Sequence, residues 1–174
     1  IQESMREKLI EKIIEHAKKI APSDPLDPET TFGALINKGH IDKVQGYLES
    51  GIAQGATLLC GGELIKQESG GYYMLPAVLD KVEPNFKVAQ EEIFGPVLSI
   101  LTFKDEAEAV QLANDSEFGL AAYVATKDVG RIHRLGKKIQ AGSLMVFSTS
   151  NLAGGGVPLS SEPHKQSGQS PHGG

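Results

Sequence analysis

Apolar side chains at the start of the chain recur every three or four residues. The repeating positions are Met5, Leu9, Ile10, Ile13, Ile14, Ala17 and Ile20. This spacing predicts an amphipathic helix, and Ser4 and Glu7 stand at the separation of a capping box at its beginning. Pro22, Pro25 and Pro28 are predicted to end the helix and to form a stiff, extended connector, because proline does not fit a helix interior.

Three further helices are predicted along the chain. The first covers residues 39–54, and Gly55 follows its end. Its inner face is formed by Ile41, Val44, Leu48 and Ile52. Another helix opens at residues 105–108, whose acidic side chains suit the positive end of a helix. The last follows Thr126, which can cap it. Its inner face is formed by Val129, Ile132, Leu135 and Ile139.

Short apolar runs between these helices predict strands. The runs are residues 57–60, 72–74, 77–79, 97–103, 118–125 and 143–147. The run 97–103 is apolar on both alternating faces, as in a strand of a parallel sheet that is covered on both sides. Alternating strand and helix patterns predict a layered α/β domain with a mostly parallel sheet. We assign residues 1–147 to this domain, and we predict that the Ser-, Gly- and Pro-rich tail 148–174 is loop or disordered.

Composition narrows the class of protein. The chain has 174 residues, a net charge of −5 and no Trp, so it offers neither a basic patch nor many stacking rings for nucleic acid. No apolar run approaches the ~20 residues of a membrane span. A single cysteine, Cys60, excludes an internal disulfide and suits a reducing compartment. We therefore expect a cytoplasmic protein without nucleic-acid or membrane partners. The chain begins with Ile1 instead of Met, which leaves processing or a longer polypeptide open.

The segment EEIFGPV, residues 91–97, places two carboxylates and a ring in front of an apolar strand. If the backbone is extended there, Glu92 and Phe94 point to the same side, because strand side chains alternate. A carboxylate can accept hydrogen bonds from a ribose diol, as acidic side chains do in other dinucleotide sites, and a ring can bound a flat heterocycle. In the alternative interpretation, Phe94 belongs to the core and both glutamates are solvated.

Several motifs occur together in a fixed order. A Glu-x-Phe-Gly-Pro box occupies residues 92–96. The other motifs are residues 24–33, 55–62, 70–76, 113–120 and 165–168. Over residues 1–147, and again at 165–168, the chain resembles the C-terminal part of the catalytic domain of the NAD(P)-dependent aldehyde dehydrogenase superfamily. The segments LDPETTFG and LANDSEFGL are similar to the corresponding segments of the aminoaldehyde branch, such as γ-glutamyl-aminobutyraldehyde dehydrogenases.

This resemblance implies a three-layer αβα fold and the oxidation of a small aldehyde to a carboxylic acid through a cysteine thioester, with NAD or NADP as cofactor. It makes Glu92 the ligand of the nicotinamide ribose and Phe94 a wall of that cofactor site. In the family, the nucleophilic cysteine, the glutamate base and the dinucleotide-binding domain precede the segment that matches Ile1. We therefore expect no catalytic residue in this chain and no activity from it alone.

Other candidates for chemistry are weaker. Cys60 has no basic neighbour or helix start that would activate its thiol, so we predict a buried structural cysteine. The five histidines show no metal-ligand spacing. After Phe147 the chain departs from the family pattern. A non-catalytic remnant that serves as a binding or assembly module is the alternative function, and homo-oligomer formation stays open.

Overall fold

The computed structural model describes residues 1–147 and 164–168, and it divides the chain into two compact units. The first unit is Ile1–Lys104 and the second is Asp105–Gly174. The domain boundary predicted after residue 147 stays a prediction. Most of the predicted tail, residues 148–163 and 169–174, lies outside the described residues.

A three-stranded sheet organises the first unit. Its strands are β1 (Thr57–Cys60), β4 (Ala77–Asp80) and β5 (Val97–Ser99), in the order β1-β4-β5. Strands β4 and β5 are parallel, as predicted, whereas β1 runs antiparallel to β4. The predicted strand 97–103 is shorter than expected, because its last residues pair with the chain start instead: Gln2 forms a parallel bridge with Phe103.

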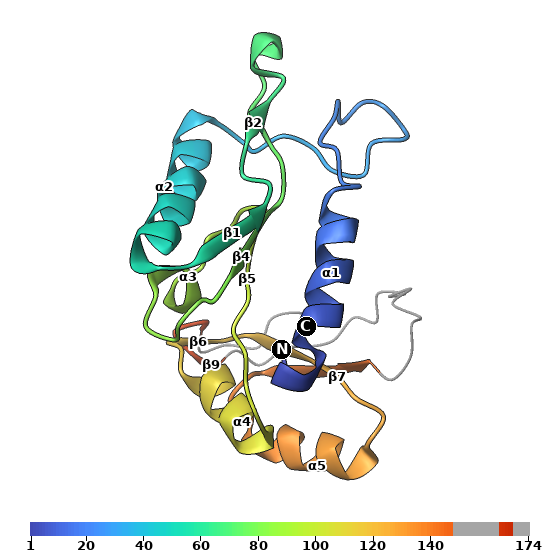
Figure 1. The fold of residues 1–174 in the computed structure, drawn as a ribbon, viewed down its shortest axis with the longest axis vertical. Coiled ribbons are helices and arrows are strands. Elements are labelled where there is room, and N and C mark those ends of the chain that lie inside the picture. The colour runs from blue at the N-terminus through green and yellow to red at the C-terminus, as the bar shows by residue number, and fades with distance from the viewer. Residues whose placement is uncertain (148–163, 169–174) are drawn as a thin grey trace. The chain divides into compact units, whose positions relative to one another are not determined.

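Helices cover both faces of this sheet (Figure 1). Helix α2 (Lys38–Gln54) lies on one face and α1 (Arg6–Ala17) on the other. The central strand β4 is buried along its whole length, and its side chains alternate between two hydrophobic clusters. Leu79 packs into the cluster that contains Val44 of α2, and Val78 into the cluster that contains Ile10 of α1. Burying each such side chain contributes about 1.5–3 kcal/mol. The first unit thus has the predicted helix–sheet–helix layers.

The ends of the two long helices differ in how well the sequence predicted them. In α2, the Asn37 side chain accepts a hydrogen bond from the His40 backbone N–H at 2.8 Å, and Gly55 closes the helix with φ 117°. In α1, a 3₁₀ turn η1 (Glu3–Met5) comes first, and no side chain caps either element. The predicted capping box of Ser4 is therefore wrong. The backbone N–H of Glu3 instead donates to the Phe103 carbonyl, at 2.9 Å.

The shorter elements of the first unit have too few residues for a periodic pattern. Of these, the sequence predicted only the strand at residues 72–74. Strands β2 (Leu64–Ile65) and β3 (Tyr73–Met74) form an antiparallel hairpin that extends beyond the sheet in Figure 1. The 3₁₀ turn η2 (Gln67–Ser69) lies between them, and the one-turn helix α3 (Lys87–Gln90) precedes β5.

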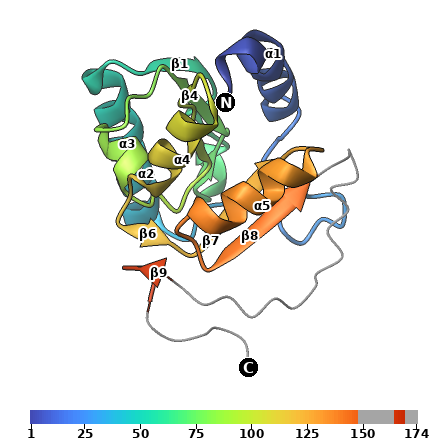
Figure 2. The same ribbon diagram turned by 90° about the horizontal axis from the view of Figure 1, so that it is seen from below.

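The second unit contains a parallel strand pair with a helix alongside it (Figure 2). Its elements are α4 (Glu106–Asn114), β6 (Phe118–Gly119), β7 (Ala121–Ala125), α5 (Val129–Lys138), β8 (Ser143–Phe147) and β9 (His164–Lys165). Strands β7 and β8 pair in parallel, and α5 lies beside them. The predicted strand 118–125 is split between β6 and β7. The side chain that caps α5 is Asp128, not Thr126 as predicted, because Asp128 accepts the Arg131 N–H at 3.0 Å.

Strand β9 lies in the tail that we predicted to be loop or disordered. It pairs antiparallel with β6, and Lys165 Nζ donates to the carbonyl oxygens of Asn114 and Ser116, each at 2.7 Å. These bonds fix residues 164–168 to the second unit. None of the helices in the described ranges is long and apolar enough to cross a membrane.

Candidate functional site

The predicted site segment, residues 91–96, links α3 to β5. Glu92 is exposed, and Phe94 is 73% exposed, whereas Ile93 between them is buried in the hydrophobic core. Phe94 is therefore not a core residue, so the first half of the alternative interpretation is wrong. The chain presents a carboxylate and an aromatic ring at the surface, where both can meet a ligand.

The backbone that presents these side chains is not the extended one we predicted. Phe94 has φ 53°, in the left-handed region, so strand alternation does not apply at this residue. Its neighbours account for the turn. Ile93 is held in the core, and a Cβ at Gly95 would lie 2.5 Å from a methyl group of Val44. The chain must therefore bend sharply to bring Gly95 against α2. The burial pattern is still exposed, buried, exposed.

Helix α2 supports this segment through two polar contacts that the sequence did not reveal. The Tyr47 hydroxyl donates to Glu91 Oε2 at 2.7 Å. His40 Nε2 lies 2.6 Å from the carbonyl oxygen of Phe94. The hydrogen bond to Glu91 is the main reason that the pKa of Tyr47 is raised above its ordinary value. The one available signal was spacing: His40, Val44 and Tyr47 stand at the separations of residues that share a helix face.

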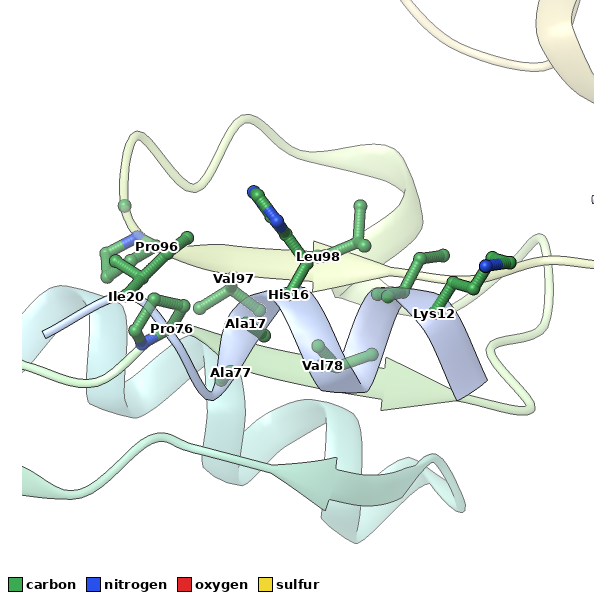
Figure 3. A pocket seen from close by; sticks show the side chains of 12 residues that line it. Lys12, His16, Ala17, Ile20, Pro76, Ala77, Val78, Pro96, Val97 and Leu98 are labelled. Carbon is green, nitrogen blue, oxygen red and sulfur yellow. The ribbon is translucent and has the colours of Figure 1, made fainter. Parts of the chain in front are cut away.

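A pocket of about 520 Å³ adjoins the other end of the segment. It lies where α1 passes over β4 and β5 (Figure 3). Its lining is mostly apolar and includes Gly95, Pro96 and Leu98, with Lys12 and His16 contributing the polar side chains. Such a lining suits an apolar group. Among the described residues that line it there is no carboxylate, so the ligand-binding chemistry of the segment rests on Glu92 and Phe94.

Cys60 is partly buried in β1, where we predicted a buried structural cysteine. Desolvation raises the pKa of its thiol, and the positive charge of Lys18 opposes this more weakly. A raised pKa keeps the group as a thiol near neutral pH, which is the less nucleophilic form. Within residues 1–147 and 164–168, no cluster of three or more His, Cys, Asp or Glu side chains could hold a metal ion.

Sequence comparison identifies similar proteins over nearly the whole chain. A family model described as "Aldehyde dehydrogenase family" matches residues 1–172. The chain is 48% identical over 151 residues to 5-carboxymethyl-2-hydroxymuconate semialdehyde dehydrogenase of Escherichia coli, covering 84% of this chain and 32% of that protein. It is 43% identical over 170 residues to betaine aldehyde dehydrogenase of Brucella anthropi, covering 97% and 34%.

Solved structures agree with this result. The NAD-dependent aldehyde dehydrogenase from Sinorhizobium meliloti matches with a TM-score of 0.91 and 41% identity, over 99% of this chain and 34% of that one. An indole-3-acetaldehyde dehydrogenase solved with NAD+ matches with a TM-score of 0.92 and 38% identity, over 99% and 34%. This chain thus spans about a third of the length of these relatives. The likeness confirms the predicted α/β fold class.

Proposed function

Because this chain belongs to the aldehyde dehydrogenase family, we propose that it forms the C-terminal part of a catalytic domain that oxidises an aldehyde to a carboxylic acid with NAD or NADP. The observation that carries the proposal is the exposed pair Glu92 and Phe94, in a Glu-x-Phe-Gly-Pro box at the start of β5. Both the NAD-dependent relative and the relative solved with NAD+ align over 99% of this chain.

Each of the two side chains has a distinct role in this proposal. The exposed carboxylate of Glu92 accepts hydrogen bonds from the hydroxyl groups of the nicotinamide ribose, and bonds to a charged group contribute about 1.5–3 kcal/mol. The exposed ring of Phe94 bounds the flat nicotinamide. When bound, the cofactor supplies the hydride acceptor for aldehyde oxidation. The residues of this chain bind and orient that cofactor.

The nucleophilic cysteine and the glutamate base belong, in this proposal, to a preceding part of the catalytic domain. Cys60 does not replace that nucleophile, because its pKa is raised by burial. We therefore expect no aldehyde-dependent NADH formation, measured by absorbance, from the isolated 174 residues. Turnover that persists in a Cys60→Ala variant would refute both the preceding nucleophile and the cysteine thioester, because Cys60 is the only cysteine of the 174 residues, and turnover abolished by Cys60→Ala would identify Cys60 itself.

The substrate proposed is an aminoaldehyde, following the resemblance of residues 26–33 and 112–120 to that branch. Relatives that support this class include the 4-trimethylaminobutyraldehyde dehydrogenase of Mus musculus, 43% identical over 150 residues. The test compares kcat/KM of the full-length enzyme for 4-aminobutyraldehyde derivatives with kcat/KM for an uncharged aldehyde of the same length. Equal values would remove the aminoaldehyde assignment.

The cofactor role of Glu92 is tested with Glu92→Gln in the full-length enzyme. We expect the Kd for NAD or NADP to rise about tenfold, because a ribose hydroxyl loses a charged acceptor. Glu83→Gln is the matched control, since it removes the same charge from an exposed position of the same unit. Unchanged Kd and an unchanged rate of hydride transfer in Glu92→Gln would refute the assignment.

An assembly module is the second candidate, and one observation favours it. Strand β5 stands at the end of the order β1-β4-β5, and its Leu98 is 46% exposed. Strand edges with apolar side chains recruit partner strands. Light scattering of the isolated chain over a range of concentrations tests this function. A dimer that Leu98→Lys dissociates supports assembly, whereas a monomer at every concentration contradicts it.

A further inference from the structure

Phe94 adopts a backbone conformation that an isolated chain would avoid. Its φ of 53° is unusual for a residue with a bulky side chain, and surrounding contacts must hold it there. The ring cannot supply that contact, because it is 73% exposed. The backbone of the turn must therefore be held by groups of the protein beneath it.

Helix α2 presents three side chains to this turn from one face. His40, Val44 and Tyr47 stand four and three residues apart, which places them one above the other. Val44 is fully buried and leaves space for a glycine only at position 95. Tyr47 donates to the Glu91 carboxylate at the start of the segment. His40 is the side chain that reaches the backbone of Phe94 itself, through the carbonyl oxygen at 2.6 Å.

The direction of the His40 hydrogen bond follows from its surroundings. A carbonyl oxygen only accepts, so Nε2 must carry the proton. The other ring nitrogen, Nδ1, is buried and has no hydrogen-bond partner among the described residues. A neutral ring with its proton on Nε2 satisfies the carbonyl and leaves no buried N–H without an acceptor. The site therefore selects one tautomer of His40.

We propose that His40 is a positioning residue, whose imidazole holds the Phe94 carbonyl and thereby places Glu92 and Phe94 for the nicotinamide half of the cofactor. This inference rests on the proposed function of those two residues. Neither Glu92 nor Phe94 is fixed by burial of its own side chain. Their positions follow from the backbone turn, and the turn is tied to α2 through the carbonyl between Phe94 and Gly95.

The first test is spectroscopic and uses the 174-residue chain. Carbon-13 NMR of the imidazole distinguishes the two neutral tautomers of His40, and we expect the Nε2–H form. In His40→Phe, which keeps a ring but loses the donor, the amide signals of Glu92, Phe94 and Gly95 should shift. In His40→Gln, whose amide can donate, they should return toward the wild type. An Nδ1–H tautomer, or unshifted signals in His40→Phe, would overturn the inference.

The second test measures cofactor binding in the full-length enzyme. His40→Phe should raise the Kd for the cofactor about tenfold and leave KM for the aldehyde unchanged, and His40→Gln should recover most of the loss. Asp105→Ala is the control for lost stability, because it removes the cap of α4 in the other unit. It should lower Tm without changing the cofactor Kd. Equal Kd values for His40→Phe and His40→Gln would overturn the positioning role.

The two proposals fail in different ways. If His40→Phe leaves the cofactor Kd unchanged while Glu92→Gln raises it, Glu92 keeps its role and the role of His40 is refuted. If neither substitution changes the Kd although His40→Phe shifts the amide signals, His40 holds the turn but the turn does not bind the cofactor, and the proposed function of Glu92 and Phe94 is refuted.

Discussion

Each of the two units of this chain is stabilised internally by a different kind of interaction. In the first unit, helices cover both faces of β4, and both hydrophobic clusters lie there. In the described part of the second unit, Leu135 is the buried apolar side chain, and Tyr123 on β7 is 63% exposed. The first unit therefore has a hydrophobic core of its own, whereas the described residues of the second unit bury little apolar surface.

Polar contacts join the elements of the second unit. Glu106 at the start of α4 accepts two hydrogen bonds from Arg134 of α5, each at 2.7 Å. Asn114 at the end of α4 donates to the Lys138 carbonyl and accepts from the Gln140 N–H, both at 2.8 Å. Exposed ion pairs contribute little free energy. We infer that the first unit is the more stable one and that the second opens more readily.

The largest effect is expected from Leu79→Ala in the first unit. Leu79 is fully buried in β4, so its truncation removes transfer free energy and leaves a cavity, at a cost of about 4 kcal/mol. Urea unfolding of the chain measures this loss. Leu120→Ala is the control, because Leu120 is exposed in the second unit, and it should cost less than about 1 kcal/mol. If the two substitutions lowered the free energy of unfolding equally, the inferred difference in stability between the units would be wrong.

A smaller loss is expected from Arg6→Ala. Arg6 of α1 pairs with Asp80 of β4, whose exposed fraction is only 3%. Removing the arginine leaves a buried carboxylate without its cation, which costs about 3 kcal/mol of the free energy of unfolding. The double variant Arg6→Met with Asp80→Leu should recover most of that loss. If Arg6→Ala is neutral in urea unfolding, the ion pair is not part of the core.

The smallest effect concerns Glu106 in the second unit. Its hydrogen bonds with Arg134 are the main cause that lowers its pKa from 4.5 to about 2. A carboxyl group with a lowered pKa in the folded state stabilises the protein above its unfolded pKa and loses this contribution as pH falls. Hydrogen exchange of α4 and α5 should therefore quicken as pH falls from 4.5 toward 2, after correction for the intrinsic rates.

Glu106→Gln is the variant that isolates this pH effect. It should show the faster exchange already at neutral pH and little additional change on acidification. Added salt should speed exchange in the wild-type chain more than in the variant, since salt screens exposed charges. Identical pH profiles for the two proteins would show that the ion pairs with Arg131 and Arg134 contribute nothing measurable.

Local patterns in the sequence predicted those elements whose causes are local. Helix α2 was predicted within one residue at its start, because its inner face and Gly55 lie within it or beside it. The capping box of Ser4 failed for a non-local reason. Glu3 pairs with Phe103, at the far end of the first unit, and this pairing sets where α1 begins. Strand β9 depends in the same way on β6, which lies far from it in sequence.

At the candidate site, too, the features set by local sequence were predicted and those set by distant contacts were not. Glu92 and Phe94 were predicted to face a ligand at the start of a strand, and both are exposed there. Their backbone was wrongly predicted to be extended, because the left-handed turn at Phe94 arises from packing against α2. The contact between Gly95 and Val44 joins residues some fifty positions apart. His40 and Tyr47 were missed for that reason: only the folded chain brings them beneath the segment.

Cys60 is a natural position for chemical labelling of the first unit. It is the sole thiol of the chain, and it pairs with Val78 across the two strands β1 and β4. A maleimide or disulfide reagent therefore modifies one atom only, and the rate of that modification reports how accessible this partly buried thiol is. The same position accepts a single fluorophore or spin label without any cysteine having to be removed first.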